Sequence, residues 1–74
     1  MKIQVACFAT LSSYAPADGY LEVNEGGTPA DILDLLGIPR QEVKVVFVNG
    51  ENSGLETTLK DNDRVGIFPA IGGG

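Results

Sequence analysis

Residues 28–37 (TPADILDLLG) have the pattern of one short helix with a defined start and end. Thr28 suits the N-cap, where a side-chain oxygen can accept an unpaired backbone N–H. Pro29 falls at the first helical position, where its missing N–H costs nothing. Asp31 lies in the first turn, where a negative charge suits the helix dipole. Gly37 fits the left-handed position beyond the last turn, so the helix is expected to end there.

The apolar residues of this helix indicate which face it buries. Ile32, Leu35 and Leu36 follow at i, i+3 and i+4 spacing, which predicts one apolar stripe. A helix this short is marginally stable alone in water. We therefore expect the stripe to pack against a sheet.

Apolar runs on both sides of the helix predict strands. They cover residues 2–9 and 20–23 before the helix, and residues 43–48 and 64–68 after it, with at most a short strand over residues 51–54. Residues 10–18 are predicted to form a loop, Asn49 and Gly50 a tight turn, and Leu55 and Leu59 a helical turn on the core. One helix covers only one face of such a sheet. The order predicts an α+β fold of the β-grasp type: a mixed sheet of four to five strands, with the first and last strands adjacent at its centre.

Alternation along the strands predicts which side chains face away from the helix. If Lys44 faces solvent, Val46 shares its open face, and Phe47 points into the core. The same alternation puts Phe8 and Phe68 on the open face. Isolated exposed apolar residues are ordinary, but Phe8, Val46 and Phe68 on neighbouring strands would form a patch of the kind that binds a partner. We favour the patch because Phe68 adjoins the end of the chain.

Length and charge limit the class of protein. Seventy-four residues make a single domain, and a formal net charge of −5 argues against binding nucleic acid. The acidic balance is compatible with a basic partner surface. No apolar run is long enough to span a membrane, and the N-terminus lacks the apolar stretch of a signal peptide. These features predict a cytoplasmic protein that binds neither nucleic acid nor membrane.

The residue types that are scarce also carry information. The chain has no histidine and one cysteine, Cys7, which lies in an apolar run. It therefore lacks the usual acid–base residue at neutral pH and a cysteine metal cluster. We predict no metal site, no bound cofactor and no enzymatic activity of the chain on its own.

The last residues, 69–74 (PAIGGG), differ from the rest of the chain. Ordering glycine costs more backbone entropy than ordering any other residue, so three terminal glycines add little to a folded domain. Glycine is needed where a backbone passes through a slot too narrow for side chains. We predict a domain over residues 1–68 and a flexible tail over residues 69–74, with a reach of roughly 20 Å.

Six pieces of the sequence together carry a resemblance: residues 8–11 (FATL), 28–33 (TPADIL), 48–50 (VNG), 59–65 (LKDNDRV), 68–69 (FP) and 73–74 (GG). With these pieces the chain resembles a known family, the ubiquitin-like sulfur carriers (the MoaD/ThiS family). This family includes the small subunit of molybdopterin synthase and the thiamine-pathway sulfur carrier. The resemblance covers nearly the whole chain, and the terminal diglycine is its most specific part.

The resemblance implies a function for the tail. An adenylating enzyme of the ubiquitin-activating type would use ATP to activate the carboxylate of Gly74, which would then become a thiocarboxylate. The large subunit of molybdopterin synthase would receive the tail, and the sulfur would pass to a pterin precursor. Gly72 and Gly73 would let the tail thread, and Pro69 would stiffen its exit.

The branch of the family is less specific than the family itself. The pair Phe68-Pro69 is more similar to the molybdopterin branch than to the thiamine branch. Ala70 stands where a second proline is frequent, and Gly72 is an additional glycine. The thiamine-pathway carrier, a protein modifier joined to targets through Gly74, and a binding domain with an incidental glycine tail remain alternatives.

Overall fold

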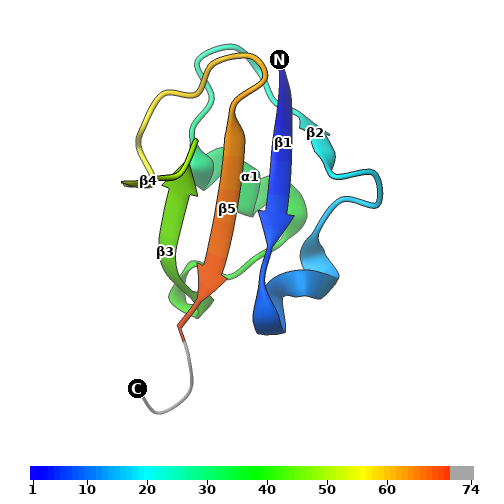
Figure 1. The fold of residues 1–74 in the computed structure, drawn as a ribbon, viewed down its shortest axis with the longest axis vertical. Helices are drawn as coiled ribbons and strands as arrows, with labels where there is room; N and C mark the ends of the chain where they lie inside the picture. Colours follow the sequence, from blue (N-terminus) through cyan, green and yellow to red (C-terminus); the bar gives the residue numbers. More distant parts are fainter. Residues whose placement is uncertain (71–74) are drawn as a thin grey trace.

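A five-stranded mixed sheet forms one layer of the structure, which is a computed structural model that describes residues 1–70. Helix α1 forms the other layer and lies across one face of the sheet (Figure 1). No helix within residues 1–70 has the length and apolar character needed to cross a membrane. The strands are β1 (Lys2–Cys7), β2 (Tyr20–Glu22), β3 (Val43–Val48), β4 (Glu51–Ser53) and β5 (Arg64–Pro69); the helices are α1 (Pro29–Leu36) and the 3₁₀ helices η1 (Ala9–Tyr14) and η2 (Arg40–Glu42).

The strand order is β2-β1-β5-β3-β4. The first and last strands, β1 and β5, pair in parallel at the centre, and the other pairs are antiparallel. The predicted β-grasp arrangement is confirmed. The face of the sheet that α1 leaves uncovered is called the open face below.

Local interactions define both ends of α1 as expected. The carboxylate of Asp31 accepts the backbone N–H of Thr28 at 2.9 Å and the Thr28 hydroxyl at 3.3 Å. At the other end, Gly37 has φ 77°, the left-handed conformation that glycine adopts without strain. The N–H of Ile38 then donates to the carbonyl oxygen of Leu33 at 2.9 Å, which closes the last turn.

The predicted stripe of α1 is wrong at one position. Leu35 is 60% exposed, whereas Ile32 and Leu33 are fully buried. At about 100° per residue, Pro29, Leu33 and Leu36 share one side of the helix, and Leu35 lies roughly 120° away from Pro29. Leu33, which the prediction omitted, takes the place of Leu35 against the sheet.

The predicted faces of Val46 and Phe47 in β3 are also wrong. Val45 pairs with Phe68 and Val43 pairs with Pro69, so one extra residue, Lys44, lies in β3 between them. Such a bulge interrupts the alternation of faces. The exposure of Lys44 therefore does not report which face Val46 occupies. Val46 is 2% exposed and packs in the core, whereas Phe47 lies on the open face.

Two connections differ from their predictions. Part of the predicted loop over residues 10–18 is the 3₁₀ helix η1, and its Leu11 is fully buried. Leu55 and Leu59 do not form a helical turn. Instead, Leu55 accepts the N–H of Ala30 at 3.0 Å, and Leu59 donates to Gly27 at 2.9 Å. This segment therefore lies along the start of α1, with the side chain of Leu59 in the core.

The folded part of the chain extends beyond the predicted boundary at residue 68. Pro69 is buried and is the last residue of β5. The N–H of Ala70 donates to the carbonyl oxygen of Glu42 at 2.9 Å. Pro69 thus belongs to the sheet, where it pairs with Val43 of β3.

Candidate functional site

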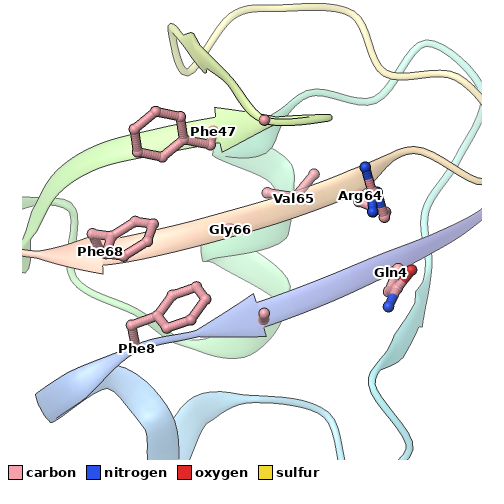
Figure 2. Close-up of a pocket in the computed structure, with 9 residues that line it drawn as sticks. Gln4, Phe8, Phe47, Arg64, Val65, Gly66 and Phe68 are labelled. Atoms are coloured by element: carbon pink, nitrogen blue, oxygen red, sulfur yellow. The ribbon is translucent and has the colours of Figure 1, made fainter.

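All three phenylalanines of the chain meet on the open face, next to the end of β5 (Figure 2). The rings of Phe8 and Phe68 are stacked, with centroids 4.3 Å apart and an angle of 6° between their planes. The ring of Phe47 meets Phe68 edge-on, with centroids 5.5 Å apart and planes at 82°. Both geometries are favourable for aromatic pairs. Phe8, Phe47 and Phe68 are called the aromatic cluster below.

The backbone holds Phe8 beside β5. Its N–H donates to the carbonyl oxygen of Ile67 at 3.1 Å, which extends the β1–β5 pairing by one residue. The strand does not continue beyond Phe8, because Ala9 has φ 51° and turns the chain into η1. The Phe8 side chain therefore stays over the sheet, and it remains 41% exposed.

Gly66 provides the floor on which the aromatic rings lie. A Cβ atom at this position would lie 3.4 Å from Cε2 of Phe8 and 3.6 Å from Cε1 of Phe68. The absence of a side chain leaves a groove of about 380 Å³ along the open face. The groove is lined by Gln4, Ala6, Phe8, Phe47, Gly50, Arg64, Val65, Gly66 and Phe68.

The end of the groove farther from the aromatic cluster is polar. Arg64 and Gln4 are directly paired residues of β5 and β1 and both are exposed. Next to them, the Lys2 ammonium group lies 4.6 Å from the ring centroid of Tyr20, within the range of a cation–π interaction. The open face therefore combines an apolar end with a polar end that carries Arg64 and Lys2.

The structure brings together two of the three residues predicted to bind a partner. Phe8 and Phe68 stack on the open face, whereas Val46 is in the core and the prediction of an exposed Val46 is wrong. Phe47, which the sequence analysis placed in the core, occupies the open face in its stead. No signal in the run of residues 43–48 identifies Phe47, because both faces of this strand are apolar.

The predicted tail residues are only partly described. Pro69 is buried at the end of β5, directly after Phe68. Gly72, Gly73 and Gly74 lie outside the described residues. The described chain thus reaches the root of the tail, and the aromatic cluster lies next to that root.

The remaining chemically active groups lie elsewhere. Burial raises the pKa of the Cys7 thiol, which packs in the core as a small apolar side chain. Within residues 1–70, no three or more His, Cys, Asp or Glu side chains are grouped so that they could hold a metal ion.

The sheet order and the single helix across one face define the class of ubiquitin-like β-grasp proteins. A family model described as the ThiS family matches residues 5–74, and the chain belongs to this family. A search of curated protein sequences gives no match. The described residues thus have the fold of a ubiquitin-like sulfur carrier.

Solved structures of similar proteins agree with this fold. A putative molybdopterin converting factor, subunit 1, from Pyrococcus furiosus is 25% identical, with a TM-score of 0.74 over 96% of this chain and 99% of that chain. SAMP1 from Haloferax volcanii is 24% identical, with a TM-score of 0.75 over 100% of both chains. A complex of subunits 1 and 2 of the molybdopterin-converting factor from Helicobacter pylori contains a chain that is 19% identical, with a TM-score of 0.60 over 100% of both chains.

Proposed function

We propose that the protein is the sulfur carrier of molybdopterin biosynthesis, with Gly74 as the group that carries sulfur. A carboxylate oxygen of Gly74 attacks ATP in an adenylating enzyme and releases pyrophosphate. A sulfur donor then displaces AMP and leaves a thiocarboxylate. The large subunit of molybdopterin synthase receives the tail, where the thiocarboxylate sulfur bonds to a carbon of a pterin precursor and displaces an oxygen leaving group. Water then cleaves the acyl–sulfur bond, which leaves the sulfur on the pterin and restores the Gly74 carboxylate. Membership of the ThiS family supports this proposal.

The observation that carries the proposal is the aromatic cluster at the root of the tail. Phe68 stacks on Phe8 one residue before Pro69, which ends β5. A partner that binds this cluster holds the point from which residues 70–74 depart. Those residues span roughly 17 Å when extended. The end of the tail is then confined to a small volume in the partner, which raises the effective concentration of its carboxylate there.

The molybdopterin branch is proposed on two observations. The 25% identical protein from Pyrococcus furiosus is described as a putative molybdopterin converting factor subunit. The residues Phe68-Pro69 resemble the same branch. In the thiamine pathway the same activated tail would serve a different acceptor.

A second function, protein modification, is favoured by a separate observation. The fold is similar to that of SAMP1, also described as a small archaeal modifier protein. In that case the adenylated Gly74 would be attacked by a lysine amine of a target protein instead of by a sulfur donor. Both functions share the activation step and differ in the nucleophile.

Mass spectrometry of the protein from its native cells separates these functions. A carrier shows a fraction of Gly74 with oxygen exchanged for sulfur, whereas a modifier leaves branched Gly-Gly remnants on target lysines. Incubation with the adenylating enzyme, ATP and a sulfide source should give the thiocarboxylate, and a variant lacking Gly73 and Gly74 should remain unmodified. A native protein with neither product would overturn both functions.

A further inference from the structure

The charges of this acidic protein are unevenly distributed between its surfaces. The chain has ten acidic and five basic residues. Arg64 pairs with Gln4, and both line the groove on the open face. Lys2 lies two residues before Gln4 on β1, so its side chain is on the same face. On β2, Glu22 pairs with Lys2 and Tyr20 pairs with Gln4. Directly paired residues point to the same side of a sheet. Glu22 is therefore an acidic residue of that face, and it lies on the edge strand β2.

The layer formed by α1 exposes more acidic than basic side chains. Asp31 and Asp34 are exposed on α1, and Arg40 pairs with Asp34 at 3.5 Å. That is the ion pair found within residues 1–70, so Arg64 has no carboxylate partner in this part of the chain. The guanidinium of Arg64 is exposed beside the groove and available to a group outside the protein.

The distance between Arg64 and Gly66, the floor of the groove, determines how far apart the matching groups of a partner must lie. Arg64 is two residues before Gly66 on the same face of β5, or roughly 7 Å away at about 3.3 Å per residue. Lys2 lies beyond Gln4 on the neighbouring strand β1. The face thus presents a groove with the aromatic cluster at one end and Arg64 at the other, and Lys2 lies beyond that second end.

We propose that the surface of the large subunit that docks on the open face is acidic, with a carboxylate opposite Arg64 and an apolar side chain in the groove over Gly66. This inference rests on the proposed function. It differs from the basic partner surface with which the net charge of −5 is compatible. Charges beyond a Debye length, about 8 Å at physiological salt, are largely screened. Glu22 pairs with Lys2, and the carboxylate of Asp61 accepts the Lys2 backbone N–H at 2.8 Å, so these two groups offset the charge of Lys2. The sign at the groove therefore follows Arg64 and not the whole chain.

A phosphate group is the other anion that Arg64 can bind. The groove favours a protein surface, because most of its lining is apolar and includes Ala6, Val65 and the aromatic cluster. A phosphate would leave this apolar area exposed. A protein surface with an apolar side chain beside a carboxylate satisfies both ends of the face.

The test compares charge reversals in the full-length protein. Arg64→Glu changes the charge on the open face, and Lys60→Glu makes the same change in net charge on the exposed turn before β5. The probe is the large molybdopterin synthase subunit encoded in the same genome. Association rates are measured by stopped flow at about 50 mM and about 500 mM salt, which change the screening length severalfold.

We expect Arg64→Glu to slow association at least about threefold at the lower salt concentration, since steering contributes about tenfold or more to such rates. At the higher salt concentration the difference should largely disappear. Lys60→Glu should have a smaller effect, and Lys2→Glu should act in the same direction as Arg64→Glu. Thermal unfolding midpoints close to that of the parent protein establish that the variants are folded.

The outcomes distinguish this inference from the proposed function. If the parent protein does not bind the large subunit, the proposed function and this inference both fail. If the parent binds and Arg64→Glu associates equally fast or faster, the inference alone is overturned. Competition by inorganic phosphate beyond that of chloride at the same ionic strength, abolished by Arg64→Glu, would show that Arg64 is a phosphate site and would also overturn it.

Discussion

Gly66 of β5 lies directly opposite Phe47 of β3, and the missing side chain of Gly66 forms the floor between all three phenylalanines. A larger residue here would fill the groove. Gly66 does not require the left-handed conformation, since it is not among the glycines with positive φ. The backbone at position 66 therefore tolerates a side chain, but a side chain there would fill the groove.

Gly66→Val should reduce affinity for the large subunit at least about tenfold, which corresponds to about 1.4 kcal/mol. Valine suits a strand, so the free energy of unfolding should change by less than about 1 kcal/mol. Titration calorimetry and thermal unfolding measure the two effects. Gly54→Ala, where an added Cβ meets nothing within 4 Å, is the control. Unchanged affinity of Gly66→Val would show that the partner does not enter the groove.

The bulge at Lys44 predicts opposite effects at two neighbouring residues of β3. Val46→Ala should lower the free energy of unfolding by about 2 kcal/mol, because it removes fully buried apolar area. Phe47→Ala should lower the free energy of unfolding by less, relative to the number of atoms removed, than Val46→Ala does. It should also weaken partner binding, since aromatic residues often anchor interfaces. Chemical denaturation and binding titration measure both. A protein that binds normally with Phe47→Ala but fails to bind with Val46→Ala while staying folded would contradict the register.

The carboxylate of Asp63 should make stability dependent on pH. It accepts Asn49 Nδ2–H at 2.9 Å and the backbone N–H of Lys60 at 2.8 Å. The hydrogen bond from Asn49 is the main cause that lowers the pKa of Asp63, and the Lys60 amide adds to it. A lowered folded pKa stabilises the protein above the unfolded pKa of about 4, and this contribution is lost as pH falls through the folded pKa.

Asp63→Asn should therefore lower the melting temperature at pH 7, and the difference from the parent should shrink as pH falls below about 4. Melting curves recorded at intervals of about one pH unit between roughly pH 2 and pH 7 measure this difference, because that range spans the titration of an Asp carboxyl. Glu25→Gln, an exposed change of the same charge, is the control. A difference that grows on acidification would show that Asp63 does not have a lowered pKa.

Removal of Gly73 and Gly74 should abolish adenylation and sulfur loading without changing the melting temperature. The last backbone hydrogen bond within residues 1–70 is that of Ala70 to Glu42, so the deletion leaves the described fold untouched. Gly73→Val should preserve the fold but impair loading, because a β-branched side chain adds bulk in a narrow slot. Sulfur loading is followed by mass spectrometry. If the truncated protein were loaded with sulfur at the rate of the parent protein, Gly74 would not be the residue that carries sulfur.

The sequence by itself determined the features that depend on near neighbours along the chain. Residues from Thr28 to Gly37 specify both ends of α1, because capping hydrogen bonds link residues three to five apart. The turn at Asn49 and Gly50 was also predictable, since both residues have positive φ, which these residue types tolerate. Order and spacing of these elements were enough to predict the β-grasp fold and the face on which Phe8 and Phe68 lie.

Only the tertiary structure decided the features that depend on contacts between distant segments. The bulge at Lys44 arises where β3 pairs with β5, and it exchanges the faces of Val46 and Phe47. A strand that is apolar on both faces carries no signal for such a shift, because a slip of one residue leaves its pattern intact. The groove over Gly66 likewise exists because pairing brings Phe8 and Phe68 above it, from strands separated by most of the chain.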